Sequence, residues 1–296
     1  MFAILLAVLA AASWGFSAVL VRMGLRDVST ASGTLLSLAA GLVMTAVLAV
    51  TFEWSRLTGI SLTAVLLFGV IGILNFPMGR YFNYMSMSHL GVGRSTPILA
   101  SAPLFAIVVA VALTGEQLRV ATAAGVVCIL CGLYVTITAP RAEGATTVVA
   151  GGRRQTLIGI AFGLGAALAY GSSQVLTRHT VSALAPPLVG AALALAWGTA
   201  GFSVFSLGSL RQRSEHFWRG ARFFMLAGLF SATGVLLMFS ALRRGEVVVL
   251  SPVLATNPLF TLVFAALLLR GVERITSRVV IGALLVVGGV VVLSVA

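Results

Sequence analysis

The sequence predicts an all-α integral membrane protein with ten transmembrane helices, arranged as two inverted five-helix repeats. First, hydrophobic residues make up 59% of the chain and charged residues 9%, against roughly 45–50% and 25% in soluble domains. Second, the stretch PILASAPLF at 97–105 returns as PVLATNPLF at 252–260, 155 positions later. Third, an odd number of spans in each repeat places the second repeat upside down relative to the first.

Apolar runs of membrane-spanning length fill the first half of the chain. A bilayer interior admits only helices and closed barrels, and the alternating pattern of a barrel is absent, so each run is expected to be a helix. Roughly 20 apolar residues cross the hydrocarbon core, which sets the expected spans at 2–23, 31–52, 61–88, 95–113 and 120–138. The third span becomes polar towards its end, and a glycine-rich turn at 91–94 precedes the fourth.

A segment rich in glycine and arginine, 139–155, is the one linker-like stretch and lies at the midpoint. Such punctuation between apolar runs is typical of a loop. It divides the chain into a first repeat at 1–138 and a second at 156–296. The expected spans of the second repeat are 156–178, 186–208, 223–242, 247–269 and 278–295.

The two halves correspond at further positions. The pattern Trp14-Gly-x-Ser17 returns as Tyr170-Gly-x-Ser173, 156 positions later, and glycines at 282 and 289 match those at 125 and 132. Inverted repeats are the architecture of many secondary transporters, in which the substrate site lies near the midplane where the repeats meet. The sequence therefore predicts a central site between the halves.

Several other classes of protein fit the sequence poorly. The formal net charge is +12, yet the 19 basic residues are all arginines scattered between apolar runs, which favours a membrane-flanking role over nucleic-acid binding. Cys128 and Cys131 have no histidine nearby, so we expect packing residues and neither a metal nor a cofactor. The chain also lacks the nucleophile and base of an intramembrane enzyme. A channel, which usually needs a repeated filter, is the less favoured alternative.

Arg80 is the most informative polar residue of the predicted spans. It lies well inside the third span, and an ionisable residue at such depth is a functional candidate because its burial is costly. Asn83 and Tyr84 follow at i+3 and i+4, so one helix face presents a cation, an amide and a phenol. A guanidinium suits a carboxylate or a phosphate. The alternative is that Arg80 extends to the lipid headgroups.

Two matching aromatic and polar faces lie on the first and sixth spans. The first face holds Trp14 and Ser17, and the second holds Tyr170, Ser173 and Gln174. Polar side chains seldom face lipid, so both faces are expected to point inward, either to a cavity or to a neighbouring helix. Asn257, in the ninth span, is a further candidate of the same kind, although the equivalent residue of the first half is Ala102.

The fourth and ninth spans are expected to be broken or kinked by prolines. These helix-break candidates are Pro97, Pro103, Pro252 and Pro258. Proline removes a backbone hydrogen bond, which frees carbonyls for a ligand or simply permits a bend. The G-x-x-x-G spacing of Gly159 and Gly163 is typical of close helix packing. It leaves a homodimer through glycine-rich helices as the alternative.

These residues together resemble the ten-helix branch of the drug/metabolite transporter superfamily, the EamA-type proteins. The resemblance rests on Trp14-Gly15, the paired prolines, the turn Gly115-Glu116 and the duplication, and it covers nearly the whole chain. The second turn departs from the pattern, because it reads Gly-Val-Glu at 271–273. The resemblance implies a transporter of amino acids, other metabolites, sugars or drugs, with a cavity walled mostly by spans other than the fifth and tenth.

We therefore predict a multi-pass protein of the cell (inner) membrane that exports small polar metabolites such as amino acids by alternating access. Its partners are a small-molecule substrate and the lipid bilayer. A multidrug or sugar transporter of the same fold is the alternative. The orientation stays open, because the resemblance implies cytoplasmic termini whereas the excess of arginines in the loops opposite the N-terminus favours termini outside.

Overall fold

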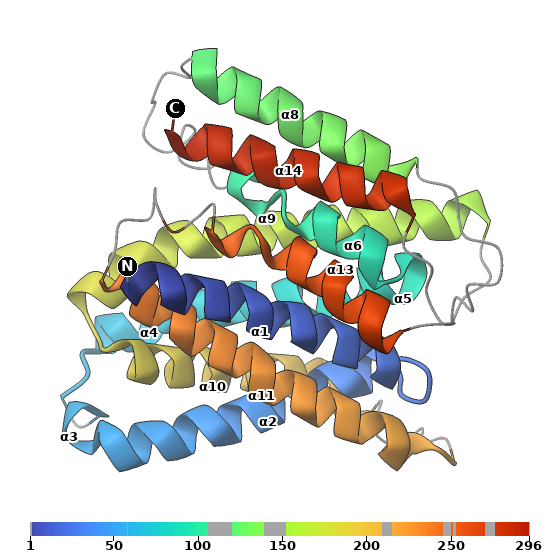
Figure 1. Cartoon of the computed structure of the whole chain (residues 1–296). Helices are drawn as coiled ribbons and strands as arrows, with labels where there is room; N and C mark the ends of the chain where they lie inside the picture. Colours follow the sequence, from blue (N-terminus) through green and yellow to red (C-terminus); the bar gives the residue numbers. More distant parts are fainter. Residues whose placement is uncertain are drawn as a thin grey trace.

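The computed structural model describes residues 2–57, 59–105, 120–138, 152–208, 215–244, 250, 253–269 and 276–295. All regular structure within these residues is helical, and the long helices lie side by side as a bundle (Figure 1). Among the described residues, six stretches are long and apolar enough to cross a membrane: Phe2–Gly24, Thr30–Phe52, Leu62–Leu90, Arg153–Gln174, Pro187–Ser206 and Phe217–Ala241. The predicted all-α membrane fold is confirmed.

The helices follow the order expected from the apolar runs. The first half contains α1 (Phe2–Gly24), α2 (Thr30–Phe52), α3 (Trp54–Leu57), α4 (Leu62–Ile73), η1 (Leu74–Arg80), α5 (Tyr81–Leu90), α6 (Val92–Leu99) and α8 (Val120–Ile137). The second half contains α9 (Arg153–Ala183), α10 (Pro187–Ser206), α11 (Phe217–Leu242), α13 (Asn257–Leu268) and α14 (Ser277–Val295).

Local sequence explains where several helices begin and end. Ser29 caps α2 by accepting a bond from the Ser32 amide, and Ser61 caps α4 through the Ala64 amide, each at 3.2 Å. These bonds satisfy amides that the first helical turn leaves unpaired. Gly91 has a φ of 80°, a left-handed conformation that glycine adopts without strain, and it ends α5.

Two predicted spans differ from a continuous α-helix. The third span passes from α4 into a π-helix, η1, which contains Pro77, and then into α5. The fourth span stops being helical after Leu99 and turns at 100–101. Pro103 explains that turn, because proline has no N–H to donate to the carbonyl of Leu99. In addition, α9 begins at Arg153, inside the predicted linker, and most of that linker lies outside the described residues.

The halves pack on each other in a two-fold pattern. The first helix of each half lies on the third span of the other: α1 packs against α11, and α9 packs against η1 and α5. Likewise α2 contacts α11 while α10 contacts α4, and α8 pairs with its counterpart α14 at the top of Figure 1. In that view α1 and α9 run in opposite directions, as inverted repeats require.

Glycine contacts repeat this pattern at the level of single residues. Gly33 lies against the ring of Phe224, and its counterpart Gly190 lies against the ring of Phe68. A Cβ on Gly228 would overlap the backbone of α2, and a Cβ on Gly72 would overlap the backbone of α10. Small residues allow helix backbones to approach closely in a membrane. The duplicated sequence thus encodes a duplicated packing surface.

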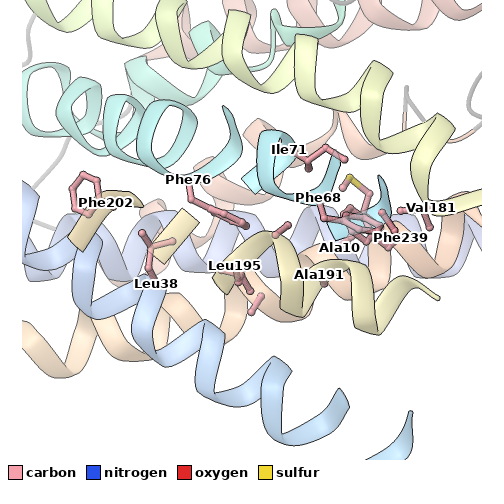
Figure 2. Close-up of a cluster of buried hydrophobic side chains, with 14 of the residues drawn as sticks. Ala10, Leu38, Phe68, Ile71, Phe76, Val181, Ala191, Leu195, Phe202 and Phe239 are labelled. Carbon is pink, nitrogen blue, oxygen red and sulfur yellow. The ribbon is translucent and has the colours of Figure 1, made fainter. Parts of the chain in front are cut away.

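A buried hydrophobic cluster joins the halves. Figure 2 shows Leu38, Phe68, Phe76 and Leu195 among its members, which come from α2, α4, η1 and α10. Phe68, Leu38 and Leu195 are fully buried. Lipid is as apolar as these side chains, so the cluster stabilises the bundle through close packing more than through removal from water. Phe76 anchors η1 in this cluster, while Asn75 and Arg80 of the same helix line a cavity.

The π-helix marks a difference in length between the repeats. Gly72 and Gly228 occupy equivalent places 156 positions apart, whereas Gly79 and Gly234 are equivalent 155 positions apart. The first half therefore has one extra residue between these glycines, within the stretch that contains η1. A π-helix accommodates an added residue inside an α-helix, and such bulges are frequent at functional sites.

Candidate functional site

A cavity of about 170 Å³ lies where the two halves meet. By the volume that one water needs, it has room for on the order of ten water molecules, which suits a small metabolite. Its described lining comes from α1, η1, α5, α6, α9, α11 and the segments around the breaks in the fourth and ninth spans. No described residue of α8 or α14 lines it, in agreement with what the resemblance implied.

All nine residues predicted to bind substrate line this cavity: Trp14, Ser17, Arg80, Asn83, Tyr84, Tyr170, Ser173, Gln174 and Asn257. The sequence interpretation missed other polar or aromatic lining residues: Asn75, Phe76, Thr96, Thr177 and Ser231. The geometry brings the predicted set together, while its role in binding stays a prediction.

Arg80 lies at the end of η1 and is buried, with 3% of its surface exposed. Its Nη2 donates a hydrogen bond of 2.8 Å to Ser231 Oγ, and its guanidinium carbon lies 4.8 Å from the centre of the Phe76 ring. Its Nη1 is buried without a hydrogen-bond partner among the described residues. The guanidinium therefore stays inside the bundle, and the alternative of extension to the headgroups is wrong.

No carboxylate faces this arginine among the described lining residues. An ion pair in the described part of the chain joins Arg219 to Asp27 at 3.8 Å, and neither residue belongs to the cavity lining. A buried cation without a counter-charge is costly, and the ring of Phe76 offsets only part of this cost. The site is thus electrostatically suited to an anionic group.

Asn83 and Tyr84 extend the polar surface beyond Arg80. Asn83 is 8% exposed, and its Oδ1 is buried without a partner among the described residues. The Tyr84 hydroxyl lies 3.4 Å from Ser37 Oγ, to which it donates. Tyr84 also packs against Phe224, with ring centres 5.8 Å apart. The helix face predicted from i, i+3 and i+4 spacing thus exists, with an unsatisfied acceptor beside the cation.

Trp14 and Tyr170 occupy equivalent positions on opposite walls. Trp14 packs on Gly234, and Tyr170 packs on Gly79, so each ring fills the space left by a glycine of the other half. The Trp14 Nε1 donates to the backbone oxygen of Ser231 at 3.3 Å. Aromatic groups of this kind offer large contact surfaces with one polar atom each.

The serines predicted beside these aromatic residues also make matching contacts. Ser17 donates to the backbone oxygen of Ala227 at 2.8 Å, and Ser173 donates to Asn75 Oδ1 at 2.9 Å. Each bond runs from the first helix of one half to the third span of the other. The serines therefore join helices and line the cavity at once, which combines the two alternatives that the sequence left open.

Asn257 lies at the start of α13, and its Oδ1 accepts a bond of 3.1 Å from Thr261 Oγ1. Pro103 and Pro258 line the cavity beside the breaks, whereas Pro97 is buried within α6. The prediction at Pro252 lies outside the described residues. The breaks thus bring backbone close to the cavity at equivalent points of both halves.

The G-x-x-x-G pair is covered within the chain. Gly159 lies against His89 and Leu90, and Gly163 lies against Ser86 and Ile98. The motif therefore packs α9 on α5 and α6. Dimerisation through glycine-rich helices stays untested. Cys128 is half-buried and Cys131 is exposed on α8, and both are free thiols.

An inverted repeat of membrane helices around a central cavity defines a transporter architecture. The model of the EamA-like transporter family matches residues 1–138 and 157–295, so the chain belongs to that family of multi-pass membrane transporters and is not an enzyme. A solved structure described as "Crystal structure of protein" is similar at 16% identity, with a TM-score of 0.62, over 98% of this chain and 95% of that one. No curated protein matches the sequence. The structural likeness supports the fold alone.

Proposed function

We propose that this transporter carries small polar metabolites with a carboxylate group, amino acids in particular, and that it exports them by alternating access across the cell (inner) membrane. One observation carries the proposal: Arg80 is a buried cation at the cavity, and its hydrogen bond among the described residues goes to a neutral hydroxyl. A substrate carboxylate would supply the missing counter-charge and accept two parallel hydrogen bonds from the guanidinium N–H groups.

The rest of the cavity fits the remainder of such a substrate. Trp14, Tyr84 and Tyr170 supply aromatic surface, and Met87 and Met238 add flexible apolar surface. The free Oδ1 acceptor of Asn83 suits an ammonium group beside the carboxylate. Movement of one repeat against the other around a fixed central site provides alternating access.

A transport panel in proteoliposomes tests the proposal. Uptake of L-phenylalanine and L-leucine is compared with uptake of their decarboxylated analogues, phenethylamine and isoamylamine, and with glucose and a cationic dye. We expect both amino acids to be transported well above protein-free vesicles, and each to exceed its amine by at least roughly tenfold, the value of one charge-assisted hydrogen bond.

The same panel contains the result that would overturn the proposal. Methionine and leucine side chains give the lining a large apolar share, which favours amphipathic drugs as the second candidate. Equal or faster transport of the amines and the dye would support that candidate and would exclude selection by a carboxylate. Preferential uptake of glucose would exclude both.

A further inference from the structure

Ser231 occupies a central position between the halves that the sequence did not reveal. It lies on α11 in the second half, yet its hydroxyl accepts from Arg80 Nη2 of the first half at 2.8 Å. Its backbone oxygen also accepts from Trp14 Nε1 at 3.3 Å. One residue thus connects three spans at the edge of the cavity.

The geometry of Arg80 shows what this bond does to the guanidinium. Nη2 is engaged by Ser231, Nη1 is buried, and one face lies over Phe76. Only 3% of the residue is exposed. A carboxylate binds a guanidinium best through two adjacent donors. In this conformation one N–H of Nη2 is directed at Ser231 and Nη1 is buried, so a carboxylate in the cavity reaches two adjacent donors only after the guanidinium turns away from the serine.

We infer that Ser231 is a positioning residue that competes with substrate for Arg80, and that a substrate carboxylate displaces its hydroxyl from the guanidinium. This inference rests on the proposed function. The serine hydroxyl is a neutral acceptor, whereas a carboxylate is charged and offers two oxygens, so the exchange favours the ligand. Ser231 thereby competes with substrate.

The exchange also links recognition to movement of the halves. The Arg80 to Ser231 bond crosses the interface between the first and second repeats, so a substrate that takes Arg80 removes one contact between them. In the third span of the first half, Asn75 accepts from Ser173 across the other interface. That second bond involves no charged group and is not subject to the same competition.

The test is the Michaelis constant for L-phenylalanine uptake in Ser231→Ala. Removing the competing hydroxyl is expected to lower KM by roughly three- to tenfold, somewhat less than the full value of a hydrogen bond to a charged group. The maximal rate is expected to stay equal or to fall. Ser231→Thr keeps the hydroxyl and should restore the parent KM. An unchanged or raised KM in Ser231→Ala would overturn the inference.

A matched control and a double-variant cycle complete the test. Thr233→Ala removes a hydroxyl two residues away on α11 that donates to the Leu229 carbonyl of its own helix and lies 3.9 Å from Met44 Sδ on α2, outside the cavity lining, and it should leave KM unchanged. In an Arg80→Ala background, Ser231→Ala should no longer change KM. If Arg80→Ala itself leaves transport of L-phenylalanine intact, the proposed function fails. If Arg80→Ala impairs it but the two variants act additively, only the role of Ser231 fails.

Discussion

The interface of α1 with α11 and the interface of α9 with η1 and α5 are equivalent by the repeat, but they differ in chemistry. Both pack an aromatic ring on a glycine, Trp14 on Gly234 and Tyr170 on Gly79. The span containing η1 places an arginine, Arg80, in the cavity lining, whereas the corresponding lining residue of α11 is Val235. Duplication therefore supplies a symmetric scaffold, while divergence at a few lining positions supplies the charge that we propose selects a substrate.

The backbone differs at the same place as the charge. The span in the first half holds one extra residue between Gly72 and Gly79, and η1 accommodates it as a π-helix. By contrast, α11 runs as a continuous helix over Phe217–Leu242. Because Arg80 is the last residue of η1, the insertion and the arginine belong to one local departure from symmetry.

The largest expected effect tests the symmetric part of this comparison. Gly72→Ala and Gly228→Ala should each destabilise the protein strongly, because the added Cβ overlaps a backbone carbonyl that has no room to move. Overpacking costs typically about 1–3 kcal/mol or more. Thermal unfolding in detergent measures the loss, and Gly201→Ala, whose nearest neighbour lies at 3.9 Å, is the control. Clearly unequal losses of thermal stability in Gly72→Ala and Gly228→Ala would show that the two interfaces are not packed equivalently.

A smaller effect is expected when the charge is moved to the other half. Arg80→Val should reduce the preference for L-phenylalanine over phenethylamine by roughly tenfold or more. Adding Val235→Arg should recover part of it, because Val235 also lines the cavity. The ratio of the two uptake rates is the measurement. No recovery in a well-folded double variant would show that the halves are not interchangeable around the cavity.

The smallest expected effect compares the two interfacial serines. Ser173→Ala leaves Asn75 Oδ1 without its serine donor, whereas Ser17→Ala affects a backbone carbonyl, that of Ala227, within a continuous helix. Each change should cost about 1 kcal/mol, with Ser173→Ala the more costly because the Asn75 side-chain oxygen loses its serine donor, whereas the Ala227 carbonyl keeps the N–H donor of its own helix. Melting temperatures in the same detergent give the order. A larger drop in melting temperature for Ser17→Ala than for Ser173→Ala would contradict this expected order.

Composition and the repeated prolines were sufficient to predict the membrane fold. The apolar composition extends along whole spans, and the repeated proline stretch reveals the duplication. The lining residues were predictable for a related reason: polar side chains inside apolar runs have few places to point except inward. Arg80, Trp14 and Asn257 all follow from that argument and all line the cavity.

The sequence did not predict the π-helix or the role of Ser231. A lone serine in an apolar span is common and is usually satisfied within its own helix, so its contact with Arg80 depends on tertiary packing. A signal for η1 was present: the spacing of the repeat falls from 156 to 155 between Gly72 and Gly79. The sequence nevertheless predicts the third span, 61–88, as one helix that becomes polar towards its end, because an apolar pattern does not distinguish α from π geometry.

Direct binding tests the central claim that Arg80 selects a carboxylate in the cavity. The protein is purified in lipid nanodiscs, and the dissociation constants of L-phenylalanine and phenethylamine are measured for the parent and for Arg80→Ala. The parent should bind the amino acid at least roughly tenfold more tightly than the amine, and Arg80→Ala should bind the two about equally, as expected when one charged hydrogen-bond partner is removed. An undiminished preference for the amino acid in Arg80→Ala would contradict the account.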